Sequence, residues 1–177
     1  RYNRPILPDP SNAIAADVVL VESTYGDRDH QADDSGTQLA DVIKSTTARS
    51  GKLVIPAFAI GRVEEVLYWL RRLEAEHRIP VLPVYVDSPM ATEALRYYSA
   101  RVAELDPDLR PTSGQVYAFA TTRFQTIAST QQSKELTASR RPAIVISSSG
   151  MATGGRVLHH LAAALPDQRN TVLFVGY

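Results

Sequence analysis

Short apolar runs alternate with stretches of helical periodicity along most of the chain. Six apolar runs predict buried strands at 17–22, 52–58, 84–88, 115–120, 143–147 and 171–176. Apolar residues at helical spacing predict helices over 39–48, 61–73, 89–98, 124–138 and 156–165. Continuous apolar strands that alternate with helices are typical of a parallel sheet covered on both faces. The pattern therefore predicts a three-layer α/β/α sandwich with a mainly parallel, Rossmann-like sheet.

Two helix starts carry capping signals. Ser35 and Gln38 predict a capping box ahead of the first helix. Ser88 followed by Pro89 predicts an N-cap with proline in the first turn. These signals fix where two of the predicted helices should begin.

The amino-acid composition excludes some classes of function for this chain. The 177 residues contain 19 Lys and Arg, 19 Asp and Glu, and no cysteine. A formal net charge of zero argues against binding nucleic acid by bulk positive charge, although it allows a local basic cleft. Without cysteine there is neither a disulfide nor a thiolate zinc site. No run is long enough to span a membrane, and the chain begins with Arg1, so we expect a cytoplasmic piece of a longer protein with no membrane partner.

Glycine-rich turns follow two of the predicted strands, and ligands of such sheets bind beyond the carboxyl ends of the strands. In GMATGGRV, Gly150 and Gly155 match a P-loop, but Arg156 replaces its lysine and the next residue is valine, which has no oxygen for Mg²⁺. A nucleotide-binding Rossmann-like module is therefore only an alternative. An anion site built from backbone amides and Arg156, or a tight turn alone, both remain open.

Three further positions have both a functional and a structural interpretation. Gly61 and Arg62 again open a helix after a strand, but Arg62 could simply pair with a neighbouring glutamate. Ser88 could contact a bound strand or only cap its helix. Glu22, at the end of an apolar run, could face a polar site or accept a structural hydrogen bond.

The acidic segment 27–34 is rich in carboxylates but lacks the histidine spacing of zinc hydrolases. A solvated acidic loop is the favoured interpretation there. His159 and His160 are adjacent and so face about 100° apart on a helix, which excludes a ligand pair on one face.

Four motifs, in their order along the chain, resemble the β-CASP domain of metallo-β-lactamase-fold RNA-processing nucleases. They are VESTYGDRDH, IPAFAIGRVEEVLYWL, VYVDSPMA, and ISSSGMATGGRVLHHL followed by NTVLFVGY. That family includes the 3′-end-processing endonuclease and ribonuclease J. The resemblance covers nearly the whole chain. It implies that residues 1–25 are the tail of a metallo-β-lactamase domain and 26–177 the β-CASP domain.

The resemblance also implies function. The parent protein would be a zinc-dependent ribonuclease with two zinc ions, held mainly by the metallo-β-lactamase domain missing from this chain. Glu22 matches the acidic motif that supports the metal centre, and the chain itself is expected to bind no metal and to be inactive alone. Its role would be to bind and position single-stranded RNA. The residues expected to contact RNA are Gly61, Arg62, Ser88, Ser149, Gly150, Gly154, Gly155 and Arg156.

Two points stay open at this stage. Some members of the family have lost their zinc ligands, so a noncatalytic scaffold in an RNA-processing complex is an alternative function. An exposed domain interface could also lead the isolated domain to self-associate.

Overall fold

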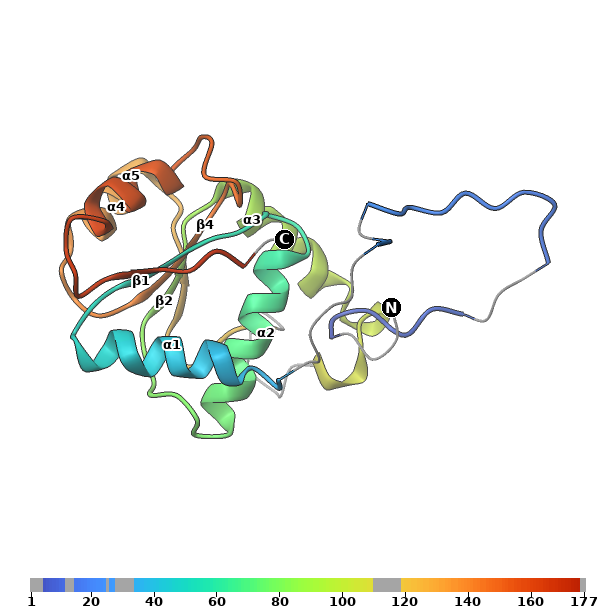
Figure 1. Ribbon diagram of the computed structural model, residues 1–177, viewed down its shortest axis with the longest axis horizontal. Helices are drawn as coiled ribbons and strands as arrows, with labels where there is room; N and C mark the ends of the chain where they lie inside the picture. Colours follow the sequence, from blue (N-terminus) through green and yellow to red (C-terminus); the bar gives the residue numbers. More distant parts are fainter. Residues whose placement is uncertain (1–4, 12–14, 25, 28–33, 110–118, 176–177) are drawn as a thin grey trace.

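A computed structural model describes residues 5–11, 15–24, 26–27, 34–109 and 119–175 (Figure 1). The regular elements, in chain order, are α1 (Thr37–Ala48), β1 (Leu53–Pro56), α2 (Arg62–Ala75), β2 (Val84–Val86), α3 (Pro89–Ala100), β3 (Phe124–Thr126), α4 (Thr130–Ala138), β4 (Ile144–Ser147), α5 (Val157–Ala164) and β5 (Thr171–Val172). Two short 3-10 helices, Val102–Glu104 and Pro107–Leu109, follow α3. Within the described ranges no helix is both long and apolar enough to cross a membrane.

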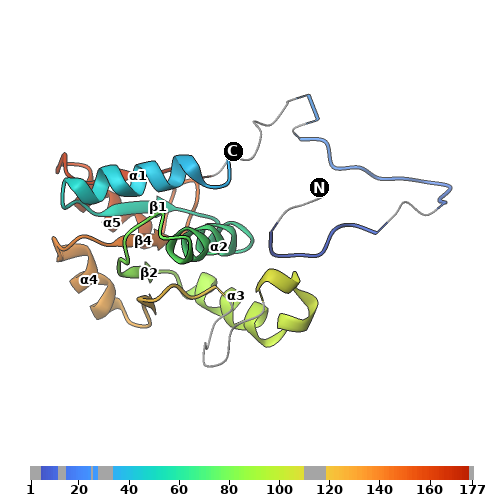
Figure 2. The ribbon, with the colours of Figure 1, turned by 90° about the horizontal axis from the view of Figure 1, so that it is seen from below.

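The five strands form one sheet of order β3-β2-β4-β1-β5, in which every neighbouring pair is parallel. Helices α1, α2 and α3 pack on one face, where their apolar side chains share the main core with β1, β2 and β4. Helices α4 and α5 lie together on the other face (Figures 1 and 2). The predicted three-layer α/β/α sandwich is therefore confirmed.

The two central strands explain why the sequence folds this way. Every residue of β1 and β4 is buried, because both strands have a neighbour on each side and helices on each face. Alternate side chains serve opposite faces, so Ile146 joins the core under α1–α3 while Val145 packs with Leu136 of α4. Each fully buried aliphatic side chain of this size contributes roughly 1.5–3 kcal/mol.

The capping prediction holds for one helix and fails for another. Ser88 is the N-cap of α3, and its hydroxyl accepts a hydrogen bond from the Ala91 N–H at 3.2 Å. The predicted capping box of Ser35 is wrong. Instead, the Asp34 carboxylate accepts from the N–H groups of Gly36 and Gln38 at 3.0 and 2.9 Å, since Gly36 is the N-cap of α1 and Asp34 precedes it.

The predicted buried strand at 17–22 is also wrong. Val18, Val19, Leu20 and Val21 are 69–94% exposed, and none of the described residues pairs with them in a sheet. Figure 1 shows this blue segment extending away from the sandwich. A strand can bury its side chains only against a neighbouring element, and this segment is not part of the sheet, whose edge strands are β3 and β5.

Two boundaries differ from the pattern-based prediction. The helix predicted over 124–138 is strand β3 followed by α4, because Ser129 forms a capping box with Gln132 that starts the helix there. Of the strand predicted at 115–120, residues 115–118 lie outside the described part of the chain, and Phe119 and Ala120 are not in a strand. The regular pairing of the last predicted strand covers only Thr171–Val172.

Candidate functional site

The turns after β1, β2 and β4 meet at the carboxyl edge of the sheet. Because β4 lies between the other two strands, its end is bonded to both sides: Ala57 N donates to Ser147 O at 3.0 Å, and Asp87 N donates to Ile146 O at 2.9 Å. The turn after β4, residues 148–156, is therefore the middle one of three. This edge is where ligands of parallel α/β sheets bind.

Two glycines of the middle turn have structural roles. A Cβ on Gly150 would lie 2.9 Å from the backbone N of Phe58, so this glycine lets the middle turn pack directly on the turn after β1. Gly155 has a φ of +82°, and a Cβ there would lie 3.0 Å from Ser148 O, so the turn folds back on itself at this residue. Gly154 differs from both, because a Cβ there would meet no atom within 4 Å.

The carboxylate of Asp87, at the end of β2, is fully buried and forms the centre of a polar cluster. Its Oδ1 accepts a hydrogen bond from Arg156 Nη1 at 2.7 Å. Its Oδ2 accepts from Ser133 Oγ at 2.5 Å and from His160 Nε2 at 2.6 Å. One side chain thus joins β2 to α4, to α5 and to the turn that precedes α5.

The hydrogen bonds continue beyond the carboxylate. The Thr137 hydroxyl donates to the Ser133 carbonyl at 2.8 Å, and its oxygen lies 3.2 Å from His160 Nδ1. Ser147 Oγ donates to the backbone carbonyl of Asp87 at 2.8 Å. Burial alone would raise the pKa of Asp87, but the bonds from His160, Ser133 and Arg156 together hold it below its usual value.

Arg156 is therefore both a structural residue and a candidate ligand contact. Its Nη1 is used by Asp87 and by the Ile127 carbonyl, the latter at 3.3 Å. Its side chain is 21% exposed, and in the described part of the chain its Nε and Nη2 donate no hydrogen bond. Two donors of the guanidinium thus remain for a bound anion.

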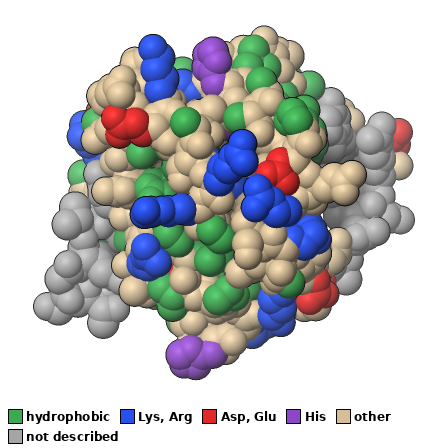
Figure 3. Space-filling view, turned by 90° about the vertical axis from the view of Figure 1, so that its left-hand side faces the viewer, with side chains coloured by type: hydrophobic (Ala, Val, Ile, Leu, Met, Phe, Trp, Pro, Cys, Tyr) green, Lys and Arg blue, Asp and Glu red, His purple; other side chains and the backbone are tan. Residues whose placement is uncertain are grey.

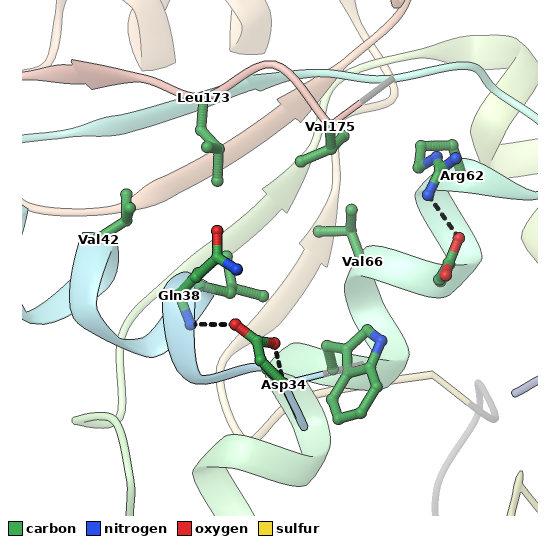
Figure 4. A pocket seen from close by; sticks show the side chains of 11 residues that line it. Asp34, Gln38, Val42, Arg62, Val66, Leu173 and Val175 are labelled. Atoms are coloured by element: carbon green, nitrogen blue, oxygen red, sulfur yellow. Dashed lines mark hydrogen bonds and ion pairs between the residues drawn. The ribbon is translucent and has the colours of Figure 1, made fainter. Parts of the chain in front are cut away.

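Arg62 occupies a different place. Its Nη1 donates to Glu65 Oε2 at 2.7 Å, which is the local pair that the sequence allowed as the structural interpretation. Figure 4 shows it at one end of a groove between α1, α2 and the segment after β5, which Val42, Val66 and Leu173 make largely apolar. The structure places Arg62 at the start of α2 and shows no contact with Arg156.

The remaining predicted contacts fall into three positions. The Ser88 hydroxyl is buried in its capping role. Ser149 is half-buried in the middle turn, with its Oγ 3.4 Å from the Thr153 hydroxyl. Gly61 begins α2 with a φ of +82° and open space around it.

Glu22 lies in the exposed segment before the sandwich. Its Oε1 accepts from the backbone N–H of Thr24 at 2.7 Å. Hydrogen bonds from the Thr24 hydroxyl and N–H lower the pKa of the carboxyl. No described residue of the carboxyl-edge turns contacts it.

Large apolar side chains also line this edge without being buried. Phe58 and Ile60 follow β1, Met90 opens α3, and Met151 lies in the middle turn, and all four are 49–66% exposed. The edge therefore combines hydrogen-bond donors with flat and flexible apolar groups, the two classes of contact that a nucleotide strand needs.

Pattern reasoning did not connect the members of the Asp87 cluster. Ser133 and His160 lie 46 and 73 positions away from Asp87 in the sequence. The only available signal was a charged residue at the end of a buried strand, which requires a partner but does not name it.

The residues described at this edge do not form a metal site. No group of three or more His, Cys, Asp or Glu side chains within the described ranges is placed to hold a metal ion. Of the acidic segment, Asp27 and Asp34 are described, and residues 28–33 lie outside the described part.

Comparison with known proteins identifies relatives of the chain. The chain is 38% identical to "Ribonuclease TTHA0252" of Thermus thermophilus over 98% of its own length and 40% of that protein's length. It is 33% identical to "Transcription termination factor FttA" of Methanosarcina mazei, over 100% and 29% of the respective lengths, and to the protein of that name from Pyrococcus horikoshii, over 97% and 27%. The chain thus spans about two fifths or less of these relatives.

The model of the Beta-Casp domain family matches residues 63–177, which run from the first turn of α2 through all the later elements of the sandwich. The match includes β2, β4 and the turns that carry Asp87 and Arg156. The chain therefore belongs to the Beta-Casp domain family.

Proposed function

We propose that this chain is the RNA-binding β-CASP part of a zinc-dependent ribonuclease, and that it positions a single RNA strand for phosphodiester hydrolysis. Its similarity to a protein named as a ribonuclease extends over 98% of the chain and supports RNA as the ligand. The chain spans 40% of that relative, so the chemistry itself is assigned to the remainder of the whole protein.

One observation carries the proposal: three turns from distant parts of the sequence converge at the carboxyl edge, with unused donors beside exposed apolar groups. Arg156 offers two guanidinium donors, which suit the oxygens of a phosphate. Gly154 leaves the backbone open to close approach. Phe58, 49% exposed, offers a ring face on which a base can stack.

The proposed zinc ions do not fit the residues that the structure describes, since these contain no suitable cluster of ligands. Zinc and the hydrolytic step are therefore both assigned to residues outside them. The exposure of Val18–Val21 supports the proposal that residues 1–25 belong with a metallo-β-lactamase domain, where these side chains would be covered. Glu22 would then act near the metal centre through that domain.

The test is RNA cleavage by the whole protein with and without a zinc chelator. We expect cleavage of single-stranded RNA that the chelator abolishes and added zinc restores. RNA cleavage that continues unchanged in the presence of the chelator would contradict the proposal. So would an absence of activity in a protein that carries a complete set of metal ligands, an outcome that would favour the noncatalytic scaffold.

A second candidate follows from the relatives named as transcription termination factors, which match 97–100% of the chain. In this role the same RNA contacts would hold a nascent transcript. Release of transcripts from a stalled RNA polymerase by the whole protein, measured beside cleavage of free RNA, separates the two functions.

A further inference from the structure

Positive charge gathers at the amino edge of the sheet, opposite the candidate site. The loops 49–52, 119–123, 139–143 and 166–170 each lead into a strand. The loop 76–83 leads into the fifth strand, β2. Together the five loops contain the cations Arg49, Lys52, Arg78, Arg123, Arg140, Arg141 and Arg169, and the carboxylates Glu76 and Asp167. The whole chain has a formal net charge of zero, so this edge is strongly enriched in cations.

Backbone hydrogen bonds bring these loops side by side. Thr171 N donates to Lys52 O at 3.0 Å, Leu53 N donates to Ala143 O at 2.9 Å, and Val84 N donates to Arg123 O at 3.0 Å. Figure 3 views the molecule from the left of Figure 1, where the loops entering the strands lie, and shows more blue side chains than red ones across that face. The cations thus form one surface, which we call the amino-edge surface.

Part of this charge has a structural explanation. Lys52 Nζ donates to the carbonyls of Leu136 and Ser139, both at 2.7 Å, and so satisfies the carboxyl end of α4. Arg49 donates to Thr171, and Arg169 pairs with Asp167 at 2.6 Å. Helix dipoles and local pairs account for these three cations.

Helix dipoles and local pairs do not account for the cations Arg123, Arg140 and Arg141. Arg123, Arg140 and Arg141 are exposed, and their guanidinium groups form no hydrogen bond or ion pair within the described part of the chain. Arg140 shares a groove with Lys52 and Arg169, while Arg141 shares the neighbouring groove with Arg123. The dipeptide 140–141 thus joins two grooves. Asp167 lines the first groove, where Arg169 and, to a smaller extent, Arg140 lower its pKa, and Glu135 lines the second, so cations outnumber carboxylates in both.

At the carboxyl edge, by comparison, Arg156 is paired with Asp87. We propose that the amino-edge surface is a second contact for the sugar–phosphate backbone of RNA, centred on Arg140 and Arg141. This inference rests on the proposed function, in that the same RNA strand supplies the phosphates. The four residues of β1 or β4 span roughly 13 Å, so a strand held at the carboxyl edge can continue onto this surface.

Guanidinium groups suit this ligand, because their N–H groups match pairs of phosphate oxygens. Binding of this kind depends steeply on salt, and the logarithmic slope falls by about 0.7 for each phosphate of a single strand that the protein no longer neutralises. The two candidate surfaces can therefore be separated by charge-neutral substitution and a salt titration.

The test measures the binding of fluorescent oligouridines by this 177-residue chain, using probes of about 6 and about 30 nucleotides at about 20–150 mM salt. Arg140→Gln with Arg141→Gln is the test variant. Arg96→Gln with Arg101→Gln is the matched control, because it removes the same charge from exposed arginines that pair with Glu93 and Glu104, outside the loops that lead into the strands. Circular dichroism verifies that both variants fold.

We expect the test variant to bind the longer probe about tenfold more weakly at low salt and with a slope lower by about 1.4, while the control changes less than about twofold. Equal losses in both variants would show that only net charge matters and would overturn the inference. So would no binding at low salt, or equally tight binding of poly-glutamate. An unchanged test variant beside a weakened Arg156→Lys variant would overturn the amino-edge surface but leave the proposed function standing.

Discussion

Arg156 donates to the buried carboxylate of Asp87 over 2.7 Å and thereby fixes the turn after β4 against the end of β2. The same carboxylate binds His160 and Ser133. The candidate RNA contact is therefore preorganised by an ion pair, and the guanidinium keeps two donors for a ligand.

The first prediction concerns this carboxylate. Asp87→Ala removes the acceptor of three side chains in a buried site, and we expect a loss of about 3 kcal/mol in the free energy of unfolding. The stabilisation by Asp87 is complete above its unfolded pKa of 3.8 and is lost as the pH falls through its lower folded pKa, so the difference should shrink in acid. Urea denaturation at neutral and acid pH measures both effects.

The control for this substitution is Glu93→Ala, which breaks an exposed ion pair with Arg96. Such a pair contributes about 0–1 kcal/mol. Equal stability losses in the two variants would show that the Asp87 cluster is not what holds the turn in place.

The second prediction separates two roles of glycine in the middle turn. Gly154→Ala should leave the melting temperature unchanged, because its Cβ would meet no atom, but should weaken RNA binding if the strand approaches the backbone there. Gly150→Ala should destabilise the fold by about 1–3 kcal/mol, because its Cβ would overlap the Phe58 backbone. Normal RNA binding by a stable Gly154→Ala variant would exclude close approach at that residue.

The third prediction tests the two arginines of the carboxyl edge. Arg156→Gln and Arg62→Gln each remove a guanidinium charge, from the ion pairs with Asp87 and Glu65 respectively. If both residues bind phosphate, the double variant should lower the logarithmic salt slope of RNA binding by about 0.7–1.4. An unchanged slope would assign Arg62 and Arg156 to structural roles alone, and the exposed Arg72→Gln variant serves as reference.

The fourth prediction follows from Glu64 in α2, a fully buried residue whose two carboxylate oxygens accept no hydrogen bond from any described residue. Burial raises its pKa to about 7 from 4.5, although the nearby amides of Glu64 and Gly61 oppose the shift. Below about pH 4.5 the carboxyl is protonated in both states and does not affect stability. Ionisation of the unfolded state then lowers stability by up to about 3 kcal/mol as the pH rises to about 7 and above.

Glu64→Gln should remove this dependence, so that the variant becomes more stable than the parent above pH 7 and similar to it in acid. Denaturation midpoints measured across this range give the comparison. The exposed Glu93→Gln variant should retain the profile of the parent. Parallel profiles for Glu64→Gln and the parent would mean that the carboxyl is hydrated or paired in solution.

Periodicity was sufficient to predict most of the sandwich. The spacing of Val63, Val66 and Leu70 predicted α2, and the burial of all three confirms it. Ser88 with Pro89 predicted the start of α3 for the same local reason: a side chain one turn away satisfies a free N–H. The strand predicted at 17–22 was wrong, because a buried strand requires a neighbouring element and the apolar pattern does not show whether one is present.

For the candidate site, too, local sequence predicted some features and the tertiary fold decided others. Local sequence was enough to predict the alternation of strands and helices and the glycine-rich turns, because backbone geometry and side-chain spacing within a few residues control them. The grouping of Asp87, Ser133, Arg156 and His160 into one cluster depends instead on the tertiary fold, because strand order β2-β4-β1 places these turns together. The meeting of Arg140 and Arg141 with cations from three other loops has the same origin, since the charge of a surface depends on which loops share an edge.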